Sequence, residues 1–411
     1  MNHFQKFYHK DLKKRYKLFL GPEKIRGIVI SNNKWRFRGN YKKVILDNII
    51  GDTEDVYQLF DDLKKHTTED STILITYHNH IWEPLLEVAS KFNLRKRLAN
   101  QNWLDEEDLK NLLEITGYDV ISVQRSILIP ADIPFISSFI NNLIAILPII
   151  NNLCLSISVV ARPKFKKEKD YSISIVIPAR NEEGNISKII SSIPKFGRSQ
   201  EIIFVEGHSF DKTWKEILKE TKNSKNNNIF RTTKAFKQNG KGKANAVWLG
   251  FEKATGEILM IYDADRTVEA KDLYKFYLVL RKNPYTFVNG SRMVYPMENQ
   301  AMRTLNKLGN KIFSLLFTWI LGQRFKDTLC GTKAIFKKEF LFIKRNYKRF
   351  FDMDPFGDFV LIFGAIKQNL KIVEIPVRYK ERSYGSTNIN RVRHGLMLLK
   401  MTFAAFKEFK L

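Results

Sequence analysis

Residues 172–183 read Ser172-Ile-Ser-Ile-Val-Ile-Pro178-Ala-Arg-Asn-Glu-Glu183, an apolar and β-branched run that gives way to polar side chains. Such a run predicts a buried strand, and the spacing of apolar residues in 184–192 predicts a helix directly after it. A strand, a short polar loop and a helix form the unit from which parallel sheets are built. Ligands of such sheets bind at the carboxyl ends of the strands, so residues 178–183 are candidate binding residues.

The same alternation continues toward the C-terminus. Apolar patterns predict strands over 201–205, 229–231 and 257–262, and helices over 211–220 and 243–254. Repeated strand–helix units of this kind fold as a mostly parallel sheet between two helical layers. The fold class predicted for this part of the chain is therefore α/β.

Length and charge divide the chain into two domains. Of its residues, 44% are hydrophobic and 13% aromatic, a composition that excludes a disordered protein. Its length of 411 residues exceeds what one hydrophobic core accommodates. A charged stretch with a proline, residues 162–170, predicts a linker, and the boundary is placed between residues 163 and 164. Residues 1–163 carry a net charge of +3 and residues 164–411 one of +23, so the basic character lies in the second domain.

The first domain also alternates between the two kinds of element. The patterns predict strands over 43–48, 71–77 and 118–123, and helices over 53–65, 82–92 and 105–116, the last capped by Asn102 or Asp105. Cys154 and Cys330 lack the spacing of a disulfide framework or a zinc site and are expected to be buried thiols. No apolar segment follows the basic residues near Met1, so we expect a cytoplasmic protein.

Three further polar motifs follow predicted strands. They are Glu206-Gly-His-Ser-Phe-Asp-Lys-Thr213, Asn239-Gly-Lys-Gly-Lys243 and Asp263-Ala-Asp265. Each is common by chance when taken alone, because acidic and hydroxyl residues often cap helices and lysines beside glycines often form solvated turns. Ser209 and Asp211, for example, are predicted to cap the next helix. The informative feature is the order of the motifs, each at the end of a strand.

Together with residues 178–183, these motifs resemble the family 2 glycosyltransferases of the nucleotide-sugar-dependent A-type fold, and most closely their dolichol-phosphate mannosyltransferase-like branch. The resemblance covers residues 171–390. It implies a metal-dependent, inverting transfer of a sugar from a nucleotide diphosphate-sugar, with Mg²⁺ or Mn²⁺ held by Asp263 and Asp265 on either side of Ala264. Two close carboxylates suit these cations, which neutralise the departing diphosphate.

The same resemblance assigns the other donor-binding side chains. It implies contacts with the base and ribose from Pro178, Arg180, Glu182 and Glu206, and cationic contacts with the diphosphate from Lys241, Lys243, Arg292 and Arg382. Glu206 stands where relatives commonly have Asp, which leaves the identity of the base open. Asn388 stands where better-known members have a lysine, and Arg378 or Arg391 are the candidates to replace that cation.

Two segments resemble the acceptor side of the family's site. Asp327-Thr-Leu-Cys-Gly-Thr-Lys333 matches the acceptor segment, and Phe356-Gly-Asp-Phe359 matches the segment in which inverting members place their base. Asp327 and Asp358 are therefore the candidate catalytic residues. If the acceptor is a hydroxyl, Asp358 removes its proton, whereas a phosphate acceptor needs no base and Asp358 orients it.

A peripheral membrane location follows from two apolar, lysine-flanked segments, residues 306–322 and 396–411. Basic amphipathic helices bind anionic lipid surfaces, and the resemblance favours a polyprenyl phosphate acceptor, with a glycan or protein acceptor left open. Ordinary core helices are the competing interpretation of both segments. Nucleic acid is not expected as a partner, because no nucleic-acid-binding motif accompanies the basic charge.

Residues 43–163 resemble the C-terminal half of a class I S-adenosylmethionine methyltransferase, in Val44-Ile-Leu-Asp-Asn, Leu74–Pro84 and Leu113–Val120. The glycine-rich first loop is missing upstream, so residues 1–163 are interpreted as a truncated methyltransferase-like domain that does not bind S-adenosylmethionine. Two alternatives remain: a scaffold or lipid-binding protein with a vestigial site, and a bifunctional protein that retains methyltransferase activity.

Overall fold

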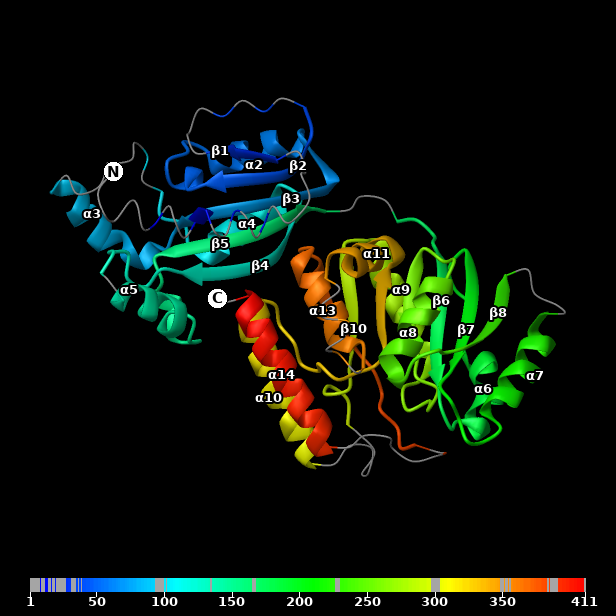
Figure 1. The fold of residues 1–411 in the computed structure, drawn as a ribbon. Coiled ribbons are helices and arrows are strands. Elements are labelled where there is room, and N and C mark those ends of the chain that lie inside the picture. The colour runs from blue at the N-terminus through cyan, green and yellow to red at the C-terminus, as the bar shows by residue number, and fades with distance from the viewer. Residues whose placement is uncertain are drawn as a thin grey trace. The chain divides into compact units, whose positions relative to one another are not determined.

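The computed structural model divides the chain into two compact units, Met1–Phe165 and Lys166–Phe409. It describes residues 8, 12, 13, 16, 19, 27–30, 35, 37, 39–92, 100, 102–133, 135–164, 168–225, 230–296, 304–347, 351, 354, 356–382, 384 and 391–409. Figure 1 shows the two units as separate sheets with their own helices. Among the described residues, no helix combines the length and the apolar character needed to cross a bilayer.

The first unit is built on a mixed five-stranded sheet in the order β1-β2-β3-β5-β4. Its strands are β1 (Gly27–Ile30), β2 (Tyr41–Asp47), β3 (Thr67–His78), β4 (Tyr118–Ser126) and β5 (Ser156–Pro163). The first three strands are parallel, and β5 runs antiparallel to both β3 and β4. The α/β character expected for residues 1–163 is confirmed, while β1 and β5 were not anticipated.

Short helices lie between the strands of this unit, and two of them, at Val56–Lys64 and Glu106–Ile115, pack against the sheet. They are α2 (Val56–Lys64), α3 (Glu83–Lys91), α4 (Glu106–Ile115) and α5 (Ile136–Phe139), with 3-10 turns at Ile49–Gly51, His80–Trp82 and Ile150–Leu153 and a π-helical turn at Ile140–Ile144. Of the two predicted caps for α4, Asp105 is the one used, because its side chain accepts a hydrogen bond from Asp108 N in a capping box. The Asn102 side chain instead donates to the carbonyls of Ile50 and Thr53.

The second unit contains a seven-stranded sheet in the order β12-β10-β11-β9-β6-β7-β8. Its strands are β6 (Ser172–Ala179), β7 (Ser199–Glu206), β8 (Arg231–Lys237), β9 (Ile258–Ile261), β10 (Thr286–Ser291), β11 (Lys333–Phe336) and β12 (Lys371–Pro376). Every pairing is parallel except those of β11, which runs antiparallel to β10 and β9. The mostly parallel sheet predicted from the alternation is therefore confirmed, with one reversed strand that the alternation does not reveal.

Helices cover both faces of this sheet (Figure 1). One face packs against α6 (Glu183–Ser192), α7 (Thr213–Lys225) and α9 (Leu273–Lys282), the last preceded by a 3-10 turn at Ala270–Asp272. The other face packs against α8 (Gly242–Lys253), α10 (Thr304–Leu321), α11 (Lys337–Asn346), α13 (Asp358–Lys367) and α14 (Arg391–Phe409). Strand residues alternate between the two cores: Ile202 and Phe204 face one, and Ile203 and Val205 face the other.

Both cysteines are buried and free, as expected. Cys154 lies in the first unit, between the Ile150–Leu153 turn and β5, and Cys330 lies just before β11 in the second. The functional consequence of the fold lies at the carboxyl ends of β6, β7 and β9. Because these strands are parallel neighbours, the loops that follow them meet at one edge of the sheet.

Candidate functional site

The acidic turn Asp263–Asp265 follows β9 at this edge. All four residues of β9 are buried, and the chain turns as soon as the polar residues begin. Asp265 Oδ1 accepts hydrogen bonds from Thr267 N at 3.1 Å and Thr267 Oγ1 at 2.9 Å, which fixes the turn. The side chains of Asp263 and Asp265 remain 32% and 16% exposed, so both carboxylates face accessible space.

Each of these carboxylates has a cationic partner from another part of the chain. Lys243, at the start of α8, places Nζ 2.6 Å from Asp263 Oδ1. Arg382, in the segment after β12, donates from Nη2 to Asp265 Oδ2 at 2.8 Å and from Nη1 to Glu182 Oε1 at 3.0 Å. The fold thus gathers five of the predicted donor-binding residues, from four separate loops, into one charged cluster.

Glu182 is the most strongly perturbed carboxylate of this cluster. It is 5% exposed, and burial, together with the nearby Asp265 and Asp263 charges, raises its pKa to about 7. Arg382 and a 2.6 Å hydrogen bond from Asn185 Nδ2 oppose the rise without cancelling it. Glu182 therefore changes its charge near neutral pH, at the position where a ligand would lie against Asp265.

The loops after β6 and β7 are joined by hydrogen bonds from backbone N–H groups of one loop to side-chain oxygens of the other. Asn181 adopts a left-handed conformation (φ 56°), and its N–H donates to Ser209 Oγ at 3.0 Å. Ser209 therefore ties the two loops together, whereas Asp211 accepts from Thr213 N at the start of α7, as a cap would. Glu206 is buried, and its carboxylate accepts from Ser209 N at 2.5 Å.

Three predicted donor residues stand at the rim of the cluster. Pro178 lies within β6 and is half-buried, while Arg180 is exposed, with its guanidinium 5.9 Å from the centre of the exposed Phe210 ring. Lys241 is exposed and precedes the first residue of α8. Arg180 and Lys241 are thus accessible to a ligand, but no described contact draws either of them to Asp263 or Asp265.

Two glycines allow close packing of the predicted acceptor-side segments, Gly331 on the acidic turn and Gly357 on α8. A Cβ atom on Gly331 would lie 2.2 Å from Asp263 Oδ2 and 2.3 Å from Lys243 Nζ, so the loop before β11 packs directly on this ion pair. Gly357 has φ 80°, and a Cβ there would lie 3.1 Å from the Trp248 ring of α8. Asp358 consequently lies near Lys243, whose pKa is raised by Asp263 and Asp358 even though burial opposes this.

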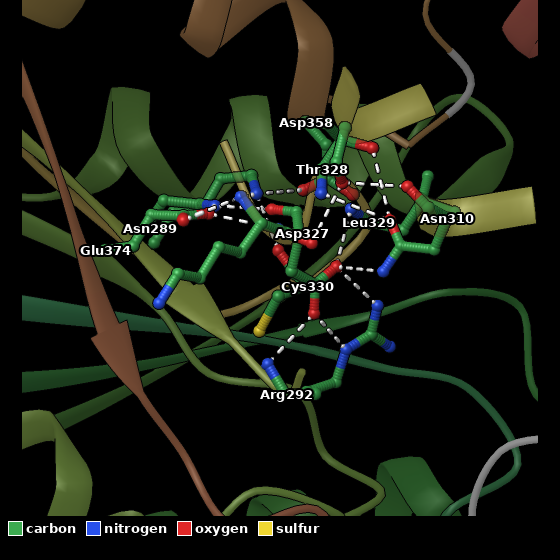
Figure 2. Close-up of polar contacts among 12 residues, drawn as sticks. Asn289, Arg292, Asn310, Asp327, Thr328, Leu329, Cys330, Asp358 and Glu374 are labelled. Carbon is green, nitrogen blue, oxygen red and sulfur yellow. Dashed lines mark hydrogen bonds and ion pairs between the residues drawn. The ribbon is translucent and has the colours of Figure 1, made fainter. Parts of the chain in front are cut away.

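Arg292 and Asp327 form a buried bidentate ion pair. Arg292 donates from Nε to Asp327 Oδ2 at 2.7 Å and from Nη2 to Oδ1 at 2.9 Å. Asp327 is fully buried and also accepts from Arg292 N, Asn310 Nδ2 and Leu329 N, contacts that Figure 2 displays. Although burial opposes it, Arg292 lowers the Asp327 pKa to about 2.

These contacts bear on the prediction that Asp327 is catalytic. A carboxylate held ionised by five hydrogen bonds is a poor proton acceptor, and no accessible surface reaches it. Four of these five hydrogen bonds join the loop before β11 to Arg292 and Asn310. The guanidinium of Arg292, predicted to contact phosphate, is turned toward Asp327 and lies 5.1 Å from the centre of the Tyr379 ring.

Several residues of this region carried no signal in the sequence. Asn289 on β10 donates to Asp327 O at 2.6 Å and to Glu374 Oε1 at 3.1 Å, and Glu374 accepts from the backbone of Lys326 and Asp327. Figure 2 shows this group between β10, β12 and the loop that carries Asp327. Single polar residues inside apolar strands are usually hydrogen-bonded groups of the core. Their partners therefore become known only from the folded structure.

The segment after Arg382 lies only partly within the described residues. Tyr384 packs over the start of α6, since a Cβ on Gly184 would lie 2.6 Å from the Tyr384 ring. Asn388 lies outside the described residues. Of the two proposed replacements for its cation, Arg378 stands over the Tyr295 ring at 5.2 Å, and Arg391 is the first residue of α14.

Part of the second unit is similar to known proteins. Residues 174–342 match the model described as glycosyl transferase family 2. Glycosyltransferase AglJ of Haloferax volcanii is 29% identical over 227 residues, which cover 54% of this chain and 68% of that protein. The UDP-N-acetylglucosamine--dolichyl-phosphate N-acetylglucosaminyltransferase of Methanococcus voltae is 29% identical over 249 residues, covering 56% and 97%.

Other relatives are more distant. The dolichol-phosphate mannosyltransferase of Pyrococcus furiosus is 26% identical over 222 residues, covering 53% of this chain and 59% of that protein. Among solved structures, glucosyl-3-phosphoglycerate synthase from Mycobacterium tuberculosis, in complex with Mn²⁺, uridine-diphosphate-glucose and phosphoglyceric acid, aligns with a TM-score of 0.41 and 16% identity, covering 58% of this chain and 80% of that one. The residues that match the family model lie in the second unit.

Proposed function

We propose that this chain, which carries a family 2 glycosyltransferase domain, moves a sugar from a nucleoside diphosphate donor to a polyprenyl phosphate at a membrane surface. Two relatives with that acceptor in their names, from Methanococcus voltae and Pyrococcus furiosus, support the acceptor class. The cluster of Glu182, Lys243, Asp263, Asp265 and Arg382 supports the donor class. It is the observation on which the proposal depends.

The cluster suits a diphosphate because two cationic side chains, Lys243 and Arg382, lie beside the carboxylates and are available to bind phosphate oxygens. Lys243 and Arg382 hold Asp263 and Asp265 in the absence of ligand, at 2.6 Å and 2.8 Å. When the donor enters, its phosphate oxygens offer these cations a second anionic partner. Asp263 and Asp265 would then be the residues that hold a divalent cation, which would neutralise charge on the diphosphate.

The donor set of Asp263 and Asp265 fits Mg²⁺ or Mn²⁺. Both side chains offer only oxygen ligands, and Asp263 Oδ2 has no hydrogen-bond donor among the described residues. Within that part of the chain, no group of three or more His, Cys, Asp or Glu side chains is gathered for a metal. The remaining ligands would therefore come from the diphosphate and water, and the bound cation would neutralise the leaving group.

The transfer itself is a single displacement with inversion at the anomeric carbon. An oxygen of the acceptor forms the new bond to that carbon while the bond to the β-phosphate oxygen breaks, and the nucleoside diphosphate leaves with the electron pair. A phosphate acceptor is already an anion, so it needs no base, and Asp358 orients it; a hydroxyl acceptor would pass its proton to Asp358. Lys243 and Arg382 stabilise the charge that grows on the diphosphate.

Two apolar stripes support membrane contact. Leu308, Ile312 and Leu315 are half-exposed or more at helical spacing on α10, and Leu396, Leu399 and Phe403 are so on α14. The two helices lie side by side in Figure 1, and Trp319 of one packs against Phe406 of the other, with 5.6 Å between the ring centres. The exposed Lys311 and Lys400 adjoin the stripes, as on helices that bind anionic lipids.

For the first unit we propose a scaffold role without S-adenosylmethionine binding. The family model and its 174–342 match lie wholly in the second unit, so no glycosyl-transfer residue is assigned to the first. Its mixed five-stranded sheet, in the order β1-β2-β3-β5-β4, is compatible with a truncated methyltransferase-like domain. Calorimetry with S-adenosylmethionine tests this, and saturable binding would favour a bifunctional protein instead.

The donor proposal is tested by calorimetry with UDP, GDP and their sugars in the presence of Mg²⁺, Mn²⁺ or EDTA. We expect one nucleotide to bind in a metal-dependent manner, and Asp263→Ala/Asp265→Ala to abolish that binding. Asp61→Ala/Asp62→Ala is the matched control, because it removes two neighbouring carboxylates from α2 in the other unit. If the folded wild-type protein binds no nucleotide, the alternative of a non-catalytic lipid-binding scaffold replaces the proposal.

A further inference from the structure

Residues 133–153 of the first unit, which include α5, expose large apolar side chains along their length. Phe135 is 93% exposed and Ile149 is 85% exposed. The other exposed side chains of this kind are Ile133, Ile136, Phe139, Leu143, Leu147 and Leu153. The sequence contains no Asp, Glu, Lys, Arg or His from residue 133 to residue 161. An exposed apolar run of this extent marks a surface that binds a partner or a membrane.

Three polar side chains of the same segment are buried or half-buried and bond to backbone groups. Asn141 accepts from Ile129 N at 2.9 Å and donates to Ile129 O at 2.8 Å. Asn151 donates to Ala145 O at 2.9 Å, and the buried Ser137 donates to a carbonyl of the loop before α5. A surface that meets hydrocarbon needs its backbone groups satisfied within the protein, because lipid tails offer no hydrogen-bond partners. This segment has that property although much of it is not regular α-helix.

A second apolar stripe lies beside this segment, on α3 and the turn before it. Its exposed side chains, at helical spacing, are Ile81, Leu85, Val88 and Phe92. The two stripes are joined, because Trp82 Nε1 donates to Leu153 O at 2.8 Å. Figure 1 shows α3 and α5 at the same end of the first unit's sheet. Residues 81–92 and 133–153 therefore form one surface, the first-unit patch.

We propose that the first-unit patch binds the surface of an anionic lipid bilayer. The inference goes beyond the proposed function, because it gives the first unit a ligand of its own. A bilayer fits better than another protein, since protein partners are held in register by polar and charged contacts, and residues 133–153 offer no charge for them. Basic residues follow the apolar ones instead: α3 ends at the exposed Lys91, and the sequence continues with Arg95-Lys-Arg97, outside the described residues. Basic residues beside an apolar surface are attracted to anionic headgroups.

The first-unit patch and the apolar stripes of α10 and α14 act as two weak anchors on one chain. Two linked weak contacts hold a protein at a surface far more tightly than either contact does alone. Loss of either one is therefore expected to release the protein from vesicles.

The test reads the surroundings of the first-unit patch directly. Phe139→Cys in the full chain is labelled with a nitrobenzoxadiazole maleimide, whose emission rises and shifts to shorter wavelength in hydrocarbon; Cys154 and Cys330 are buried and do not compete for the label. With vesicles of phosphatidylcholine and phosphatidylglycerol, we expect that shift, and quenching of the label by lipids that carry a nitroxide on their acyl chains. Tyr57→Cys on α2 is the matched control, an exposed aromatic position outside the patch, and its label should not respond.

A charge-insertion variant measures how much the first-unit patch contributes. We expect Phe139→Glu/Ile149→Glu to lower the affinity for these vesicles by at least about tenfold, because both side chains lose their burial in lipid. Tyr57→Glu/Ile115→Glu is the control, since it adds the same charge at exposed positions of the same unit and should leave the affinity unchanged. Both variants replace exposed side chains, so folding is retained, and circular dichroism checks this.

Three results would overturn the inference. They are a label at position 139 that does not respond to vesicles, equal losses of affinity in the two double variants, and a label shift that appears without vesicles as protein concentration rises. The last result would identify a second copy of the chain as the ligand of the patch. A protein that shows the expected shift with vesicles but binds no nucleotide refutes the proposed function alone.

Discussion

Arg382 and Asp265 are 117 residues apart in the chain, yet the guanidinium Nη2 donates to Asp265 Oδ2 at 2.8 Å. The same guanidinium donates to Glu182 at 3.0 Å. One side chain therefore links the segment after β12 to the loops that follow β6 and β9. In this arrangement Arg382 neutralises a carboxylate proposed to hold the metal. Binding of the proposed donor and metal therefore requires the Arg382 guanidinium to exchange Asp265 for a phosphate of the donor.

Substitution of Arg382 should weaken donor binding. We expect Arg382→Met to lower the affinity for the nucleotide by about 10- to 100-fold, because a charge-assisted hydrogen bond contributes about 1.5–3 kcal/mol. Calorimetry with the nucleotide identified for the wild type measures the change. Lys380→Met is the control from the same segment, since Lys380 pairs with Glu269, and equal losses in both variants would contradict a specific role for Arg382.

The raised pKa of Glu182, about 7, predicts a pH dependence of stability. The folded state retains a proton that the unfolded chain loses near pH 4.5, so the stabilising effect is complete below that pH and is lost as pH rises through about 7. Relative to Glu182→Gln, the wild type should therefore lose up to about 3 kcal/mol of unfolding free energy between pH 4.5 and 7.5. Urea unfolding at a series of pH values checks this, and parallel curves for the two proteins would argue against it.

Gly331→Ala should damage the metal site while the fold persists. The added Cβ would lie 2.2 Å from Asp263 Oδ2, so Asp263 or the loop before β11 must move. We expect metal-dependent nucleotide binding to fall by at least about tenfold, with a cooperative unfolding transition retained. Gly309→Ala on α10 is the control, because a Cβ there meets nothing within 4 Å and should leave binding unchanged.

Asp327→Asn should destabilise the second unit strongly. It leaves Arg292 buried without a counter-charge, a change that typically costs about 3–5 kcal/mol. The lowered Asp327 pKa of about 2 also means that its stabilisation is complete above pH 3.8 and is lost as pH falls toward 2. Denaturant unfolding at pH 7 measures the first effect; a loss of activity without a loss of stability would instead restore Asp327 as a catalytic candidate.

Charged residues in the apolar stripes should prevent vesicle binding. We expect Leu315→Glu/Phe403→Glu to abolish co-sedimentation with vesicles that contain anionic phospholipid, because both side chains are exposed, by 64% and 69%. Leu341→Glu on α11 is the control, an exposed leucine outside the stripes. Vesicle binding that persists in the double variant would favour the interpretation of α10 and α14 as ordinary surface-packed helices.

The local sequence was sufficient to predict the helices and strands whose apolar residues recur at regular spacing, and the polar residues at the ends of the strands. Strands of a parallel sheet are buried on both faces and therefore need near-continuous apolar runs, such as residues 175–178 and 202–205. The acidic turn after β9 indicated that ligands bind at the carboxyl ends of these strands. The family resemblance then named Asp263, Asp265, Lys243, Glu182 and Arg382. Parallel register brings the first four together, since neighbouring strands end at the same edge.

Only the tertiary structure could decide how those charges are paired and which acids remain reactive. The reversed strand β11, the burial of Asp327 against Arg292 and the placement of Lys333 beside Asp358 all depend on contacts between segments tens of residues apart. A carboxylate's protonation depends on burial and neighbouring charges, and neither is visible in the order of residues. The sequence thus determined the α/β fold class and the resemblance that predicts the donor-binding residues, while packing determined that Asp327 is buried in an ion pair with Arg292 and that burial raises the pKa of Glu182.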